Sequence, residues 1–227
     1  MLYPPKCKFC GHILDTSRSD ICTRCKNSLR AIEGEVCHYC GAELDKCMCA
    51  PFRHDYKFER NVAVYYYDGP AREIIRRLKF RSRPQLCEFM ADLMVKSIHK
   101  YYKDIVFDAV VFVPMLRVKQ IDRGYNQAQL LAESIANRLN LDVQYNVVGR
   151  HLKSKTQKNL TLEQRVINAK GSFFLKDSSN IIGKTILLVD DVFTSGSTIS
   201  ECAGKLKEGG ASKVYTVTFT VPLKNNQ

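Results

Sequence analysis

The residues whose types and spacing most clearly suggest chemistry lie at positions 186–198, which read ILLVDDVFTSGST. An apolar run ends in two carboxylates, and a segment of hydroxyl residues and glycine follows. In order, these residues are Asp190, Asp191, Thr194, Ser195, Gly196, Ser197 and Thr198. Carboxylates accept hydrogen bonds from ribose hydroxyls, and hydroxyls together with the N–H groups of a helix start bind one phosphate. The segment therefore predicts a site for a sugar phosphate, with Mg²⁺ nearby if the ligand carries a pyrophosphate.

Two elements must position this site. Residues 185–189 predict a buried strand, and the hydroxyl segment predicts the start of a helix that runs to about Glu208. In open α/β sheets, ligands bind just beyond the carboxyl ends of the strands. The strand, loop and helix resemble the motif that binds phosphoribosyl pyrophosphate (PRPP) in type I phosphoribosyltransferases. They do not form a P-loop, because the pattern Gly-x4-Gly-Lys-[Ser/Thr] is absent.

A second chemical pattern is the pair of cysteine quartets in the first 49 residues. The first quartet is Cys7, Cys10, Cys22 and Cys25, and the second is Cys37, Cys40, Cys47 and Cys49. A Cys-x2-Cys pair turns both sulfurs to one point, and two such pairs complete a tetrahedron around Zn²⁺. Four thiolates leave no open position for water, so both sites are expected to be structural. The second pattern is less regular, since it ends in Cys-x-Cys and His38 could compete; we expect His38 to be exposed instead.

A segment this short cannot build a sufficient apolar core, so metal binding must supply much of its folding energy. The sequence alone predicts that a chelator unfolds residues 1–50 and leaves the rest folded. Three roles for this module remain open: docking a partner protein, gripping nucleic acid, or bracing the main domain. The other two cysteines, Cys87 and Cys202, stand alone in helical patterns and are expected to be buried.

Composition restricts the class of protein. The 227 residues carry a net charge of +12, and residues 57–227 hold 27 basic against 16 acidic side chains. Attraction for phosphates or nucleic acid must therefore come mainly from this larger part. No apolar run approaches the length of a membrane span, and no signal peptide is recognised. Together with cysteines placed for metal rather than disulfides, this favours the cytoplasm.

A basic segment follows an aromatic one in the first half of the larger part. Between positions 72 and 83 there are six basic residues and one acid, Glu73. The basic residues are Arg72, Arg76, Arg77, Lys79, Arg81 and Arg83. Bases that stack on aromatics beside a basic track are typical of single-strand binding, and Tyr65, Tyr66, Tyr67 and Phe80 lie nearby. The alternative, which we slightly favour, is that the tyrosines pack in a sheet and the arginines form a solvated helix face.

The remaining periodicity completes an α/β pattern. Strands are predicted at 61–67 and 108–113, helices at 71–80 and 85–102, a linker at 51–60, and a loop at 115–123. The predicted fold is a Rossmann-like parallel sheet flanked by helices. It is preceded by a small double zinc-ribbon module. The predicted domains are 1–50 for the zinc module and 61–227 for the phosphoribosyltransferase-like part.

Several blocks together resemble the ComF family over nearly the whole chain. They are the Cys-rich start, Arg123-Gly124-Tyr125-Asn126-Gln127, Thr156-Gln157 with Leu160, Arg165 and Asn168, and the PRPP motif. The resemblance implies cytosolic competence factors that act on incoming single-stranded DNA during natural transformation. It also implies links to the helicase ComFA and the recombination mediator DprA. The chain is similar as well to amidophosphoribosyltransferase-like members of the family.

The resemblance also implies roles for particular residues. The pyrophosphate loop of type I transferases corresponds to residues 114–119, which makes Arg117 and Lys119, with the nearby Arg123, candidates for pyrophosphate. The flexible catalytic loop, which closes over the pyrophosphate, corresponds to the basic stretch of Arg150, His151, Lys153, Lys155 and Lys158. This stretch could equally follow a nucleic-acid backbone. His151 could serve as an acid or base, but we expect an idle loop histidine.

Three functions follow from this sequence. The first is a nucleic-acid handling factor that binds PRPP or a 5′-phosphorylated DNA end with Mg²⁺. The second is an active phosphoribosyltransferase that displaces pyrophosphate with an unidentified nucleophile. The third is a regulator that senses PRPP without chemistry. Fold alone does not choose between them.

Overall fold

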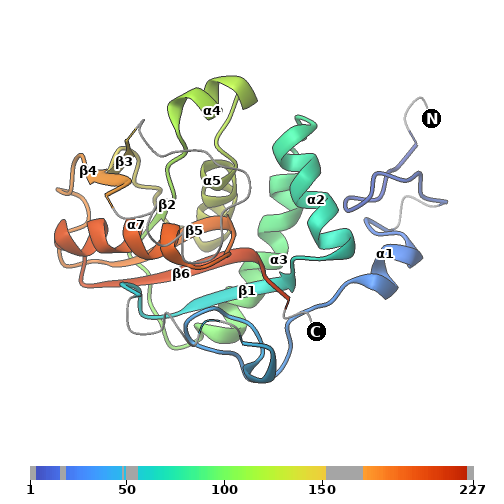
Figure 1. Cartoon of the computed structure of the whole chain (residues 1–227), viewed down its shortest axis with the longest axis horizontal. Helices are drawn as coiled ribbons and strands as arrows, with labels where there is room; N and C mark the ends of the chain where they lie inside the picture. Colours follow the sequence, from blue (N-terminus) through green and yellow to red (C-terminus); the bar gives the residue numbers. More distant parts are fainter. Residues whose placement is uncertain (1–3, 16–18, 48, 50–55, 152–170, 224–227) are drawn as a thin grey trace.

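The computed structural model describes residues 4–15, 19–47, 49, 56–151 and 171–223. Its centre is a parallel sheet in the order β1-β6-β5-β2 (Figure 1). The strands are β1 (Asn61–Tyr66), β2 (Ala109–Phe112), β5 (Thr185–Val192) and β6 (Lys213–Val221). Val143 adds one parallel bridge beside Val110 at the β2 edge. The predicted parallel sheet is therefore confirmed.

Helices cover both faces of this sheet (Figure 1). α3 (Leu86–Tyr101) and α5 (Gln127–Leu139) pack on one face together with α2 (Gly69–Phe80), and α7 (Ser197–Glu208) packs on the other. Alternating residues of β5 divide between the faces, because successive side chains of a strand point in opposite directions. Leu187 and Val189 join the α3 and α5 side, whereas Ile186 and Leu188 join the α7 side.

Two features lie beside the carboxyl ends of the strands. The first is a two-stranded antiparallel ribbon of β3 (Val148–Arg150) and β4 (Phe173–Leu175). The residues between its strands that the sequence singled out lie outside the described residues: Lys153, Lys155, Thr156, Gln157, Lys158, Leu160, Arg165 and Asn168. The second feature is α4 (Arg117–Arg123), which ends at the left-handed Gly124 with φ 85°. The prediction of a loop at 115–123 was therefore wrong. Its apolar residues Val118 and Ile121 are exposed, so this helix has no buried apolar face of the kind that sequence periodicity detects.

The N-terminal residues wrap around the β1 edge of the sheet (Figure 1). Ala31 forms an antiparallel bridge with Tyr65, and Ile32 N–H donates to Val64 O at 3.0 Å. This pairing covers a strand edge that would otherwise expose unpaired backbone groups. On either side of it lie α1 (Thr23–Ser28), which belongs to the first quartet, and the 3₁₀ turn η1 (Leu44–Lys46), which belongs to the second.

The described end of the predicted linker, residues 56–60, is packed rather than extended. Phe58 is buried, and Glu59 N–H donates to Val214 O at 2.8 Å. Aromatic residues that seemed aperiodic in sequence here fill space beside α7 and β6. The division into 1–50 and 61–227 stays a prediction, since the two parts share both cores. Among the described helices, none is long and apolar enough to cross a membrane.

Candidate functional site

A pocket of about 400 Å³ opens at the carboxyl ends of β2 and β5. Of the residues predicted from sequence, it is lined by Asp190, Asp191, Thr194, Thr198, Lys119 and Arg123. Arg117 lines an adjoining cleft instead. Residues that the sequence did not assign to this site also line it, namely Tyr67, Lys79, Asn126 and Gln127, together with Arg150 from the basic stretch that the family resemblance assigns to the catalytic loop. The strand ends thus gather acids, hydroxyls and cations from five separate segments.

The hydroxyl segment forms the turn between β5 and α7. Gly196 is the N-cap of α7 and has a left-handed backbone with φ 74°, which a residue with a Cβ rarely adopts. Because the cap residue is glycine, no cap side chain occupies the first N–H groups of the helix. Ser195 is buried, and its Oγ lies 2.8 Å from Ser197 Oγ. The backbone and hydroxyls suit one phosphate, and the assignment of this segment to a phosphate stays a prediction.

The two carboxylates have different surroundings. Lys79 Nζ lies 2.6 Å from Asp191 Oδ2, and Gln127 Nε2 donates to Asp191 Oδ1 at 3.3 Å. Burial alone would raise the pKa of Asp191, but the Lys79 ammonium holds it below its usual value. Burial, followed by the charge of Asp191, raises the pKa of Asp190. Burial and the repulsion between the two carboxylates therefore favour a single charge on the pair.

Cations face these carboxylates across the pocket. Lys79, Lys119, Arg123 and Arg150 line the same pocket, and burial, followed by the charges of Arg150, Arg123 and Lys79, lowers the pKa of Lys119. Arg150 lies 5.0 Å from the ring centre of Phe173, and its buried Nε has no hydrogen-bond partner among the described residues. A cluster of cations and an unpartnered guanidinium N–H suit a multiply charged anion such as a pyrophosphate.

The adjoining cleft of about 1030 Å³ shares Pro114, Met115, Asn126 and Arg150 with the pocket. Its described lining includes Arg117, Arg150 and Lys176 and no acidic residue. Aromatic pairs also line it: Phe112 meets Tyr145 at 6.0 Å, and His151 meets Phe174 at 4.6 Å. A ligand larger than a sugar phosphate can therefore extend from the pocket into this cleft.

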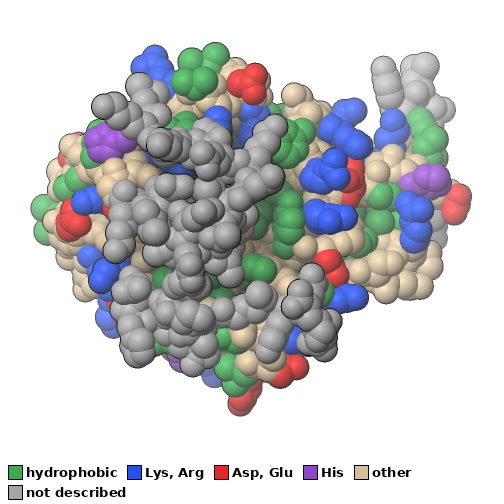
Figure 2. All heavy atoms as spheres, in the orientation of Figure 1, with side chains coloured by type: hydrophobic (Ala, Val, Ile, Leu, Met, Phe, Trp, Pro, Cys, Tyr) green, Lys and Arg blue, Asp and Glu red, His purple; other side chains and the backbone are tan. Residues whose placement is uncertain are grey.

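Lys79 and Arg77 are the two basic candidates that the structure places differently from a solvated track. Lys79 belongs to the pocket, as described above. Arg77 donates from Nη1 to Lys8 O at 2.6 Å and to Cys7 O at 3.2 Å, so it holds the first cysteine knuckle. Arg72, Arg76, Arg81 and Arg83 remain exposed around α2, where Figure 2 shows basic side chains gathered. Tyr65 and Tyr66 are buried, which confirms the favoured alternative that they pack in the sheet.

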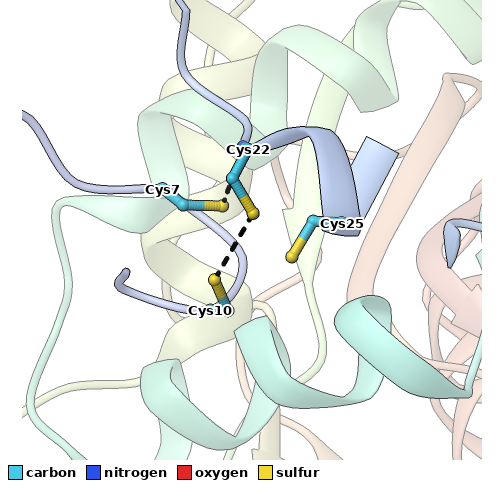
Figure 3. A group of neighbouring side chains, drawn as sticks. All are labelled: Cys7, Cys10, Cys22 and Cys25. Atoms are coloured by element: carbon cyan, nitrogen blue, oxygen red, sulfur yellow. Dashed lines mark hydrogen bonds between the residues drawn. The ribbon is translucent and has the colours of Figure 1, made fainter. Parts of the chain in front are cut away.

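Both cysteine quartets converge as metal sites. Within each quartet, the four Sγ atoms lie within 4.8 Å of one another, and Figure 3 shows the first set facing a common point. Tetrahedral Zn²⁺ with Zn–S bonds of about 2.3 Å requires sulfurs about 3.8 Å apart. Cys10 and Cys22 are 3.8 Å apart, and Cys37 and Cys49 are 3.5 Å apart. The donor sets therefore fit zinc, and His38 is exposed, as expected.

Comparisons with known proteins agree with this architecture. A phosphoribosyl transferase domain model matches residues 126–226, and a double zinc ribbon domain model matches residues 1–53. Competence protein F of Haemophilus influenzae is 27% identical over 92% of this chain and 93% of its own length. Competence protein ComFC of Bacillus subtilis is 26% identical over 88% and 83%, respectively. DNA utilization protein YhgH of Escherichia coli K12 is 27% identical over 93% and 94%.

A crystal structure of adenine phosphoribosyltransferase aligns with 64% of this chain and 74% of that chain, at 16% identity and a TM-score of 0.43. The domain matches, the parallel sheet and the paired quartets define a type I phosphoribosyltransferase fold that carries an N-terminal double zinc ribbon. Similarity over nearly the full length to competence protein F and ComFC, together with the two domain matches in this chain, supports the ComF family.

Proposed function

We propose that this chain is a ComF-type factor of DNA uptake that binds PRPP or a 5′-phosphorylated ribose together with Mg²⁺. The observation that supports the proposal is the pocket that brings Asp190 and Asp191 together with Lys79, Lys119, Arg123 and Arg150. It lies beside the hydroxyl segment, residues 194–198, which we call the phosphate loop. Asp190 and Asp191 would accept hydrogen bonds from the ribose hydroxyls, and residues 194–198 would hold the 5-phosphate. Mg²⁺ would bind mainly to the pyrophosphate and water, and it would neutralise part of the anion's charge.

The same factor handles single-stranded DNA in this proposal. Support comes from the names of its full-length relatives, which are competence and DNA utilization proteins. Further support comes from the exposed arginines of α2 and from the cleft without acidic lining. A cytoplasmic location belongs to the same proposal, because zinc thiolates need a reducing compartment. ComFA and DprA are proposed partners on the family resemblance alone.

The test combines two binding measurements. Calorimetry with PRPP and Mg²⁺ should show binding to the wild type and at least tenfold weaker binding to Asp190→Asn. Asp104→Asn, an exposed carboxylate at the amino-end side of the sheet, is the matched control and should bind like the wild type. Fluorescence anisotropy with single-stranded DNA at two salt concentrations should show weaker binding at high salt. A wild type that binds neither PRPP nor a 5′-phosphate would refute the proposal.

The second candidate function is an active transferase that displaces pyrophosphate from PRPP. The observation in its favour is the cleft that shares four lining residues with the pocket, since it offers room for an acceptor. In this case the cations would stabilise the leaving pyrophosphate, and the carboxylates would secure the ribose hydroxyls. Release of pyrophosphate from PRPP on addition of cell extract, abolished in Asp190→Asn, would support the transferase over the binding factor.

A further inference from the structure

Tyr56 connects the second cysteine quartet to the phosphate loop. Its hydroxyl donates to Ser195 O at 2.8 Å, across 139 positions of sequence. Its ring meets Phe193, the residue before Thr194, edge-on at 6.0 Å between ring centres. The backbone of the loop is therefore held from behind by a side chain that does not line the pocket.

The loop conformation depends on this packing. A Cβ added to Gly196 would lie 2.7 Å from the Tyr56 ring and 2.5 Å from the Phe193 ring, closer than real Cβ contacts. Glycine at 196 is thus required by a positive φ and also by two rings that fill the space behind the loop. Immediately after Tyr56, Lys57 N–H donates to Ser200 Oγ at 3.0 Å, which adds a second attachment on α7.

The Tyr56 ring also contacts aromatic residues beside the second quartet. Tyr39, which lies between the ligands Cys37 and Cys40, meets it at 6.0 Å. Phe58 stacks on it at 5.0 Å, and Phe58 is buried in the same apolar cluster as Cys37, Cys40 and Cys49. A continuous set of packed side chains therefore runs from the metal ligands through Tyr39 and Tyr56 to Ser195.

We propose that Tyr56 is a positioning residue that makes the shape of the phosphate loop depend on the second zinc site. Loss of that zinc would free Tyr39 and Tyr56 and loosen the loop amides that bind phosphate. The first quartet contacts α2, α3 and β1 instead, and its route toward the loop passes through the Lys79–Asp191 ion pair of the pocket rather than through Tyr56. The consequence for ligand affinity rests on the proposed function, but the consequence for loop order does not.

Tyr56→Phe is the direct test, because it keeps the ring and removes only the hydrogen bond to Ser195. Tyr102→Phe is the matched control, since the buried Tyr102 hydroxyl also donates to backbone carbonyls, Arg60 O at 2.8 Å and Thr216 O at 2.7 Å. The first readout is amide hydrogen exchange over residues 193–200 in the ligand-free protein. We expect faster exchange there in Tyr56→Phe and in Cys49→Ser, and wild-type exchange there in Tyr102→Phe.

The second readout is affinity for PRPP with Mg²⁺, with the zinc content of each variant measured by elemental analysis and expected to be full in Tyr56→Phe. Loss of one hydrogen bond should weaken binding about fivefold in Tyr56→Phe. Adding Cys49→Ser to Tyr56→Phe should cost less than Cys49→Ser costs alone, because both act through one contact. Unchanged exchange at 193–200 in Tyr56→Phe would overturn the inference. Faster exchange at 193–200 in Tyr56→Phe, when the wild type binds neither PRPP nor a 5′-phosphate, would support the inference and refute the proposed function instead.

Discussion

The two cysteine quartets have the same ligands but hold different parts of the molecule. The first lies on the α3 side of the sheet, where Phe9 packs edge-on against Tyr65 and Phe89 and Arg77 of α2 holds the knuckle backbone. The second lies on the α7 side, where Cys40 O accepts from the buried Asn61 Nδ2 at 2.8 Å and Tyr39 contacts Tyr56. Two chemically equivalent metal sites therefore brace a basic helix and a phosphate loop, respectively.

The two regions meet at one contact within the pocket. Lys79 comes from α2, which the first quartet holds, and its partner Asp191 comes from β5, which leads into the phosphate loop. The contact matters because a ligand that binds Asp191 or displaces Lys79 would act on both regions together. Two similar zinc ribbons can thus have unequal effects on one site, depending on which elements they contact.

Removal of both zinc ions should have the largest effect. The sequence alone predicts that residues 1–50 unfold while the rest stays folded, but both quartets share cores with the sheet. Packing instead predicts that a strong chelator lowers the melting temperature of the whole chain by more than about 10 °C, because structural zinc supplies folding free energy. Thermal unfolding followed by helical circular dichroism measures this, since most helix lies outside residues 1–50. An unchanged main transition would favour the independent module.

Asp191→Asn should have the next largest effect, because it leaves the Lys79 ammonium without its partner in a mostly buried position. Breaking such a pair costs several kcal/mol when fully buried, and about 2 kcal/mol with Lys79 about a quarter exposed. The melting temperature should fall by roughly 5 °C. Asp190→Asn is the matched control. It should keep or raise the melting temperature, because it replaces a carboxylate that burial disfavours.

The fold was more predictable than the site, for physical reasons that particular residues show. Apolar runs such as residues 185–189 predict a buried parallel strand, and Cys-x2-Cys pairs predict a metal site. Both patterns can be read because their residues are close together in the sequence. Lys79 was assigned to nucleic acid because only the fold brings it 2.6 Å from Asp191, 112 positions later. Tyr56 was missed, since one tyrosine in an aperiodic segment carries no pattern, whereas Arg150 was named within the basic stretch that the family resemblance assigns to the catalytic loop. The Asn126-Gln127 pair did carry a signal, through the block that marks the family.

Binding of PRPP should depend on pH through Asp190. Burial and the neighbouring Asp191 raise the pKa of Asp190 to about 8, so this side chain is mainly protonated in the free protein at neutral pH. Mg²⁺ and ribose hydroxyls favour the carboxylate, so affinity should rise by up to about fiftyfold from pH 6 to 8 and level off only above the pKa of Asp190. Calorimetry in buffers of different ionisation enthalpy should show release of up to one proton. Asp190→Asn should release none, whereas pH-independent binding by the wild type would contradict the assignment.

The smallest expected effect concerns DNA, and it sharpens the comparison between the regions. The exposed arginines of α2 belong to the first quartet's region, whereas Arg117 and Lys176 line the cleft beside the pocket. Removing one side chain that binds a DNA phosphate should reduce the slope of log affinity against log salt by about 0.7 for a single strand. Three double variants are compared. The first carries Arg76→Ala and Arg83→Ala, and the second carries Arg117→Ala and Lys176→Ala. The third, Lys96→Ala and Lys103→Ala, removes the same charge elsewhere on the surface and is the control.

If single-stranded DNA binds along α2, only the first double variant should show a smaller salt slope, and its affinity for PRPP should stay unchanged. In that case the first zinc ribbon positions the helix that binds DNA, and the second positions the phosphate loop. If single-stranded DNA binds in the cleft, the second double variant should show the smaller salt slope. PRPP should then compete with DNA, because Arg150 lines both the cleft and the pocket. Equal reductions in all three variants, including the control, would show that net charge alone attracts DNA, and neither ribbon would then have a role in placing it.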